Sequence, residues 1–111
     1  MIDKQEFYHG AVVIRLLEDG RCQNIHKYDF GYTVNGQAFI FPKYSTKSRS
    51  PWRFNFSDDD IKRLNTLALS FNKVIIALVC DGDGICAVSW KDCEILLGRR
   101  FSSFNQFLSP L

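Results

Sequence analysis

Residues 73–80 (KVIIALVC) constrain the fold more than any other segment of the chain. Seven consecutive apolar residues follow Lys73, without the polar alternation of a half-exposed strand. A short run of this kind, rich in β-branched residues, is typical of a strand buried on both faces of a sheet. A membrane-spanning helix needs roughly 20 apolar residues. We therefore expect a central strand and no membrane segment.

The composition fits one globular domain. The chain has 111 residues, of which 46% are hydrophobic and 23% are charged, and ten are Phe. This apolar bulk is enough for one core without a metal or a disulfide. The net charge of +2 is too small to imply a polyanionic partner by itself.

The N-terminus and the cysteines predict a cytoplasmic protein. Residues 1–6 turn polar before an apolar run can form, unlike a secretory signal peptide. The four cysteines contain no C-x-x-C pair and match no common zinc spacing. They are Cys22, Cys80, Cys86 and Cys93. In a reducing compartment we expect free thiols, no bound metal and no cofactor.

The first helix begins at a capping box formed by Asp3 and Glu6 and ends near Gly20. Apolar residues at helical intervals predict its buried face. The stripe consists of Phe7, Ala11, Ile14 and Leu17, and it is widened by Tyr8, Val12 and Leu16.

A hairpin is predicted at Asn35-Gly36, a preferred two-residue turn between two β-prone runs. This turn predicts the pairs Val34–Gln37, Tyr32–Phe39 and Phe30–Phe41. In that register one core face is formed by Phe30, Tyr32, Val34, Phe39 and Phe41.

Flanking segments are assigned from shorter patterns. Residues 22–28 predict a weak strand before the hairpin. After it, Pro42 ends regular pairing or marks an edge strand. Residues 43–50 are typical of a polar, basic loop, and residues 52–56 alternate as a strand with its aromatic side chains inward.

The second half of the chain predicts a helix, a strand pair and a short helix. Ser57 and Asp60 form a second capping box, and the helix that they begin ends near Asn72. Strands 73–80 and 85–89 flank a turn at residues 81–84. Ser89 and Asp92 cap a third helix that closes at Gly98.

The predicted fold class is therefore α+β, in one domain over residues 1–98. The element order is α-β-β-β-(β)-α-β-β-α, with the helices packed on one mixed, mostly antiparallel sheet. Residues 99–111 are expected to form either a loose tail or a short amphipathic helix.

Two segments carry a resemblance to known proteins. Residues 43–56 (KYSTKSRSPWRFNF) and 78–85 (LVCDGDGI) resemble a group of small bacterial proteins with a KYST…SPW-F-F…LVC-DGI pattern. That resemblance implies a shared fold and no particular activity. The element order also resembles the αβββαβ core of PD-(D/E)XK nucleases, which is an analogy of fold alone.

A nuclease of that type needs two carboxylates to hold Mg²⁺ and a Lys near the attacking water. The resemblance implies Asp29 as the first acid and Lys43 as the Lys, with Glu6 or Glu18 as a substitute second acid. Phe41 stands where the second acid is required. The predicted register places Lys43 opposite Tyr28 and sends Asp29 to the other face of the sheet. Mg²⁺ is expected only under this alternative.

A basic segment is the other candidate site. Four cations occur within eleven residues without an acid among them. With the neighbouring Tyr44, the candidate nucleic-acid-binding residues are Lys43, Tyr44, Lys47, Arg49 and Arg53. Cations, hydroxyls and an aromatic ring suit contact with a nucleic-acid backbone and stacking on bases. The alternative is a solvated loop in which Trp52 anchors the core.

Two smaller groups have structural explanations. The acids of residues 81–84 could hold a divalent ion, but Gly and Asp are also what a hairpin turn requires. His9 and His26 are far apart in sequence and form no recognisable catalytic pattern.

We therefore expect a non-enzymatic domain that binds nucleic acid through residues 43–53. One alternative is a protein-interaction or homodimerisation module, in which Phe101, Phe104, Phe107 and Leu108 pack on another subunit. A divergent metal-dependent nuclease is the other.

Overall fold

The computed structural model describes residues 1–45, 54–82 and 84–97. Its elements follow one another as α1 (Lys4–Glu18), β1 (Ile25–Tyr28), β2 (Gly31–Val34), β3 (Ala38–Ser45), α2 (Asp58–Ser70), β4 (Lys73–Cys80), β5 (Ile85–Ser89) and α3 (Trp90–Leu97). This confirms the predicted α+β class. The expected tail, residues 99–111, and the predicted helix end at Gly98 lie outside the described residues.

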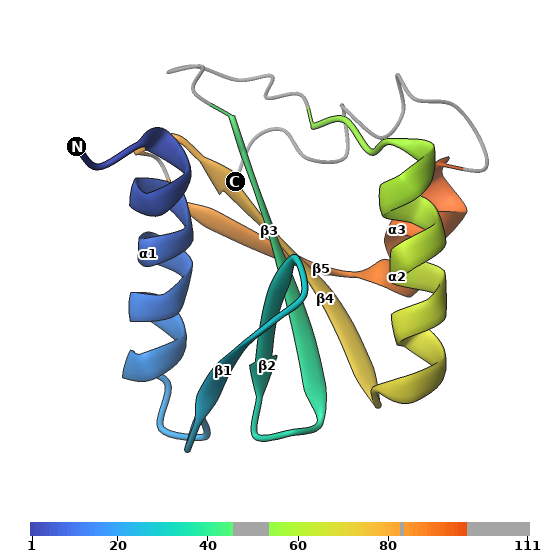
Figure 1. Ribbon diagram of the computed structural model, residues 1–111, viewed down its shortest axis with the longest axis horizontal. Helices are drawn as coiled ribbons and strands as arrows, with labels where there is room; N and C mark the ends of the chain where they lie inside the picture. The colour runs from blue at the N-terminus through green and yellow to red at the C-terminus, as the bar shows by residue number, and fades with distance from the viewer. Residues whose placement is uncertain (46–53, 83, 98–111) are drawn as a thin grey trace.

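The five strands form one mixed sheet in the order β1-β2-β3-β4-β5. The pair β3–β4 is parallel and the other three pairs are antiparallel. Helix α2 is the crossover between the two parallel strands, as a parallel pair requires. Figure 1 shows α1 on one side of the sheet and α2 with α3 on the other.

Strand β4 is central, as its sequence predicted. It pairs with β3 along its whole length and with β5 on its other edge. Its residues from Ile76 to Cys80 are all buried. Both faces of the strand are therefore covered, which explains why polar alternation is missing from residues 74–80.

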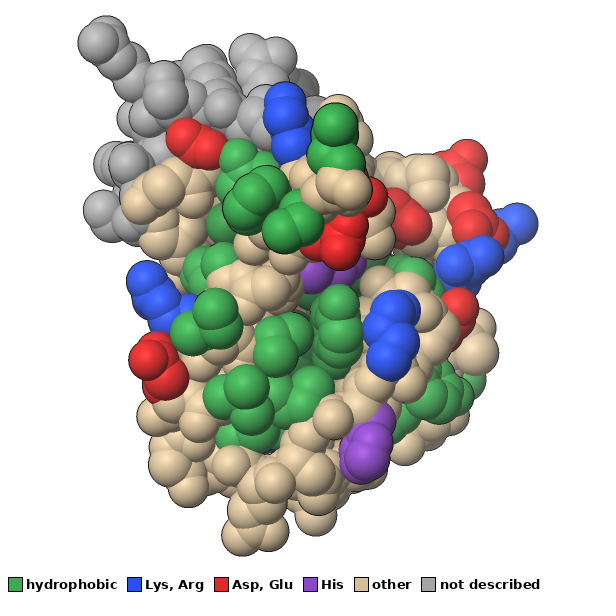
Figure 2. All heavy atoms as spheres, turned by 60° about the vertical axis from the view of Figure 1, so that its left-hand side comes forward, with side chains coloured by type: hydrophobic (Ala, Val, Ile, Leu, Met, Phe, Trp, Pro, Cys, Tyr) green, Lys and Arg blue, Asp and Glu red, His purple; other side chains and the backbone are tan. Residues whose placement is uncertain are grey.

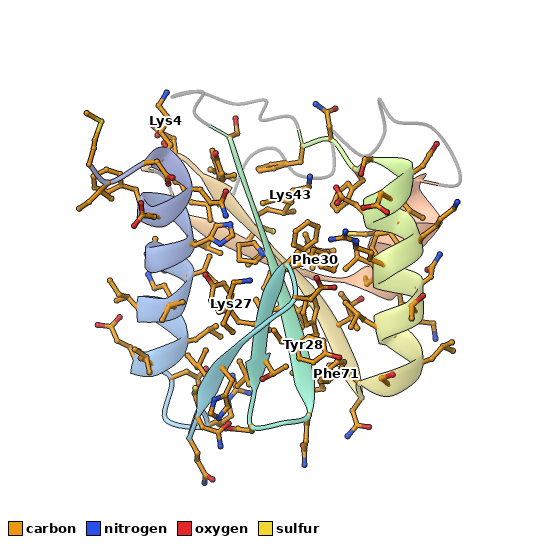
Figure 3. All side chains as sticks on the ribbon, viewed as in Figure 1. Lys4, Lys27, Tyr28, Phe30, Lys43 and Phe71 are labelled. Carbon is orange, nitrogen blue, oxygen red and sulfur yellow. The ribbon has the colours of Figure 1, made fainter. Side chains whose placement is uncertain are left out.

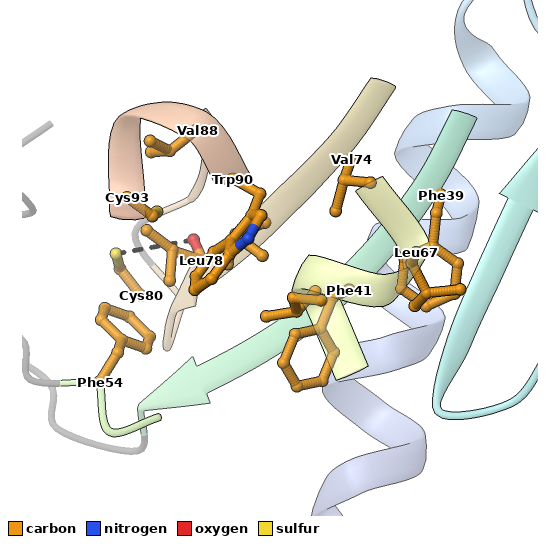
Figure 4. Packing of buried hydrophobic residues seen from close by; sticks show 12 residues of the cluster. Phe39, Phe41, Phe54, Leu67, Val74, Leu78, Cys80, Val88, Trp90 and Cys93 are labelled. Atoms are coloured by element: carbon orange, nitrogen blue, oxygen red, sulfur yellow. Dashed lines mark hydrogen bonds between the residues drawn. The ribbon is translucent and has the colours of Figure 1, made fainter. Parts of the chain in front are cut away.

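Two apolar clusters lie on opposite faces of the sheet. On the α1 face, Val12 packs with Ile40, Ala77 and Val79. The cluster on the α2 and α3 face is larger, and Figure 4 shows Phe54, Cys80, Cys93 and Trp90 within it. Its other buried members are Phe39, Phe41, Leu64, Leu67, Val74, Ile76, Leu78 and Val88.

Both predicted capping boxes are confirmed. In α1, the Glu6 amide donates to the Asp3 carboxylate at 2.8 Å, and the Asp3 amide donates to Glu6 Oε1 at 3.2 Å. Ser57 and Asp60 form the same reciprocal pair at the start of α2. Each cap satisfies backbone donors that a helix start leaves without a partner.

The predicted buried stripe of α1 is wrong in part. The residues that pack on the sheet are Tyr8, Val12 and Leu16. Phe7, Ile14 and Leu17 stay 65%, 57% and 62% exposed. Apolar residues occupy more than one face of this helix, so periodicity alone could not select the face that contacts the sheet.

The predicted hairpin register is also wrong, by one residue. The turn forms where expected, because Gln37 N donates to Val34 O at 3.1 Å and both Asn35 and Gly36 have positive φ. However, Val34 pairs with Ala38, so Gln37 is an extra residue on the β3 side. This bulge reverses the alternation of one strand relative to the other. Tyr32 and Val34 therefore leave the face that holds Phe39 and Phe41.

The stretch after the hairpin differs from prediction as well. Strand β3 continues through Pro42 to Ser45, so Lys43 belongs to a strand instead of a loop. Pairing with β2 does end at Ile40, and Pro42 remains paired with Ala77 of β4. The missing amide of Pro42 is tolerated because β2 no longer runs beside it. Residues 54–56 are not a strand, although Phe54 is buried as expected.

Candidate functional site

The candidate catalytic residues lie on two sides of the sheet. Glu6 is exposed at the start of α1, where its carboxylate serves the capping box. Asp29 and Lys43 both contact α2, on the opposite side of the sheet. The structure therefore does not bring Glu6 together with the other two.

Asp29 and Lys43 face the same helix, contrary to the sequence-based prediction. Lys43 pairs with Leu78 of β4 instead of lying opposite Tyr28. Asp29 lies in the β1–β2 turn with φ 50°, so strand alternation does not set its direction. Its carboxylate is 3.8 Å from the Arg63 guanidinium of α2.

Lys43 is engaged within the fold. Its ammonium is 3.2 Å from the Asp60 carboxylate, and both side chains are only 22% exposed. The same ammonium lies 5.0 Å from the ring centroid of Phe56 and 5.4 Å from that of Phe41. Figure 3 shows Lys43 above Phe30 on the α2 side. These contacts stabilise the packing of α2 on β3 and leave Lys43 little freedom to bind a ligand.

Arg63 forms a second ion pair on α2, in addition to that of Lys43 with Asp60. Its Nε is 3.1 Å from Asp59, and its guanidinium lies 5.3 Å from the Phe30 centroid. Among the described residues, no three His, Cys, Asp or Glu side chains are grouped so that they could hold a metal ion. The acids here are partners of cations, which is the arrangement expected of structural ion pairs.

Tyr44 lies on the other face of the sheet. Its ring stacks on the Tyr8 ring of α1, with centroids 4.6 Å apart and an interplanar angle of 16°. The Tyr8 hydroxyl donates to Asp81 at 2.6 Å, and this bond raises the pKa of Tyr8. Tyr44 is therefore part of the attachment of α1. Lys47, Arg49, Trp52 and Arg53 lie outside the described residues.

Asp81, one of the two acids in the predicted turn, acts as a structural group. It has φ 48°, its amide donates to Ser45 O at 3.1 Å, and its carboxylate accepts from Tyr8. His9 is also structural: its Nδ1 is 3.2 Å from the Tyr32 hydroxyl. Burial, followed by the charge of Lys27, lowers the pKa of His9.

In the described part of the chain, none of the four cysteines is joined in a disulfide. Cys80 and Cys93 are fully buried in the larger apolar cluster. Burial raises the pKa of Cys93 to about 12, so its thiolate is scarce at neutral pH.

An open groove of about 720 Å³ lies between the end of α2, strands β4 and β5, and the start of α3. Phe71, Val74 and Trp90 line it, and Lys73 and Lys91 stand beside them. The indole of Trp90 donates to Asn65 at 2.9 Å, so its polar group is already used. The described lining therefore combines apolar side chains with polar ones, namely Asn65, Asn72, Lys73, Ser89 and Lys91.

The surface that sequence reasoning missed is the outer face of α1. Three large apolar side chains, Phe7, Ile14 and Leu17, project from it, and Ile2 is also 61% exposed just before the helix. Figure 2 turns the α1 side of the molecule forward and shows hydrophobic side chains gathered there. Because apolar residues cover more than one face of α1, the sequence did carry a signal for a second contact surface.

Comparison of the chain with protein-family models, curated proteins and solved structures yields no match. No described helix has the length and apolar character that crossing a membrane requires.

Proposed function

We propose that this protein is a protein-interaction module that binds its partner through the outer face of α1. We call this surface the α1 stripe and define it as Phe7, Gly10, Ile14 and Leu17. The observation that carries the proposal is the exposure of its three large side chains, each more than half accessible. Burying a side chain of this size contributes roughly 1.5–3 kcal/mol.

The arrangement of these residues distinguishes them from ordinary surface residues. Single exposed apolar side chains are normal on proteins, and Leu69 on α2, 89% exposed, is such a residue. Phe7, Ile14 and Leu17 instead recur along one side of a single helix. Apolar side chains that recur along one side of a helix are typical of a binding surface.

A photo-crosslinking amino acid tests the proposal directly. We would place it at position 14 of the full chain in cells and, as a matched control, at position 69. Ile14 and Leu69 are both exposed apolar residues on helices, but they lie on opposite sides of the sheet. The expected result is a covalent protein adduct at position 14 that is absent at position 69. Equal or absent crosslinking at the two positions would reject the proposal.

A second candidate function is nucleic-acid binding through residues 43–53, favoured by the four cations of that segment and the absence of acids within it. Because Lys43 is paired with Asp60, we expect the contacts with nucleic-acid phosphates to come mainly from Lys47, Arg49 and Arg53. We do not extend this candidate to cleavage, because Phe41 occupies the position of the required acid and Glu6 lies on the opposite side of the sheet.

A further inference from the structure

We propose that the partner of the α1 stripe is a second copy of this chain, bound through an antiparallel pairing of the two α1 helices. This inference rests on the proposed function, because it names the occupant of the same surface. It follows from the spacing of the stripe, from the glycine at its centre and from the charges beside it.

The spacing of the stripe fits a helix pair. Positions 7, 10, 14 and 17 alternate by three and four residues, the pattern of the contact positions in paired helices. A two-fold axis perpendicular to the helices makes each contact occur twice. Phe7 then packs against Leu17 of the second copy, and Ile14 lies over Gly10 of the second copy.

Gly10 is explained by this arrangement. Glycine in the interior of a helix weakens the helix, so its presence there needs a reason. Packing within the chain gives none, since a Cβ atom at Gly10 would meet no heavy atom within 4 Å apart from its chain neighbours and the backbone of its own helix. The gap instead leaves room for a large side chain from outside, and in the antiparallel pair that side chain is Ile14.

The charges beside the stripe are complementary in this orientation. Lys4 and Glu18 are exposed at opposite ends of α1, and heptad spacing places both on the same flank as Ala11. In an antiparallel pair, matching flanks face each other. Lys4 of each copy therefore approaches Glu18 of the other, while the two Ala11 residues meet near the axis. A parallel pair would instead bring the two Lys4 residues to one end of the pair and the two Glu18 residues to the other, so neither would meet an opposite charge.

A charge swap provides the test. Sedimentation equilibrium of the full chain should show a monomer–dimer equilibrium. Lys4→Glu or Glu18→Lys alone should weaken the dimer about tenfold, because each turns two attractive contacts into two repulsive ones. The double variant restores both pairs with the charges exchanged, so its affinity should return to that of the original chain. Ile14→Asp should abolish the dimer, and Leu69→Asp should leave it unchanged.

Three results would overturn the inference: a chain that stays monomeric at its highest soluble concentration, a dimer insensitive to Ile14→Asp, or a double variant no tighter than the single ones. Thermal unfolding of every variant verifies that loss of the dimer does not reflect loss of the fold. The crosslinker at position 14 separates this inference from the proposed function. An adduct with a different protein supports the interaction module and rejects the dimer, whereas no adduct rejects both.

Discussion

The Tyr8 hydroxyl and the Asp81 carboxylate are joined by a 2.6 Å hydrogen bond that links α1 to the turn between β4 and β5. The two residues are 73 positions apart in sequence. Beside this bond, Tyr8 stacks on Tyr44 at the end of β3. One side chain therefore connects the first helix to both parallel strands, which positions the α1 stripe relative to the sheet.

The Tyr8–Asp81 bond predicts a loss of stability at alkaline pH. The hydrogen bond, burial and the charge of Asp81 raise the pKa of Tyr8 above its ordinary value of 10.0. A raised pKa stabilises the folded state below pH 10.0, and this contribution disappears as the pH rises through the folded-state pKa. Tyr8→Phe should remove this part of the pH dependence and lower stability at neutral pH. Urea unfolding at about pH 8 and at about pH 11 measures both effects; identical profiles for the two proteins would contradict them.

His9 predicts a loss of stability at acidic pH. Burial and Lys27 lower the pKa of His9 below its ordinary value of 6.5, while Asp3 opposes them. A lowered pKa stabilises the folded state above pH 6.5, and the contribution is lost as the pH falls through the folded-state pKa. His9→Gln should therefore flatten the decline in unfolding free energy below pH 6.5. A His9→Gln profile that declines as steeply as that of the original chain would contradict this prediction.

Asn35 is predicted to be a sensitive position of the hairpin turn. Its Oδ1 accepts from the amides of Gln23 and Asn24 at 2.8 and 3.1 Å, and its Nδ2 donates to Arg21 O at 2.8 Å. It also adopts φ 55°, which residues with a β-carbon disfavour. Asn35→Ala removes the hydrogen bonds and fits the positive φ less well, so it should cost about 1–3 kcal/mol of unfolding free energy.

Asn35→Gly separates the two contributions, because glycine tolerates the positive φ and lacks only the hydrogen bonds. Its free energy of unfolding should fall between those of the original chain and Asn35→Ala. If both variants unfold with the original midpoint, the side-chain bonds of Asn35 do not hold the hairpin to the segment that follows α1.

The elements of this fold were largely predictable because their signals are local. Capping boxes identified the starts of α1 and α2, and the unbroken apolar run of residues 74–80 identified the central strand. The predictions that were wrong concern features that depend on contacts between distant segments. The extra residue at Gln37 coincides with a hydrogen bond from Asn72 N to Gln37 O, which the hairpin sequence alone does not reveal.

The candidate sites were harder to predict for the same reason. Lys43 was expected on a polar, basic loop, but parallel pairing with β4 extends β3 through it and brings it to Asp60. Phe7, Ile14 and Leu17 were assigned to the core because Phe7 and Tyr8 belong to overlapping apolar faces. Only the position of the sheet decides which of the two faces remains exposed.

Nucleic-acid binding by residues 43–53 predicts a specific salt dependence. Removing a cation that binds one phosphate should reduce the slope of log affinity against log salt by roughly one. The triple variant Lys47→Ala, Arg49→Ala, Arg53→Ala should therefore lower the slope by about three.

Lys43→Ala should act mainly on stability, because it leaves Asp60 without its partner at 3.2 Å. The matched control removes three exposed cations elsewhere, Arg15, Lys62 and Lys91, and so makes the same change in net charge. If the control lowers the slope as much as the triple variant, or if the original chain shows no salt-dependent binding to DNA or RNA, residues 43–53 are not a nucleic-acid site.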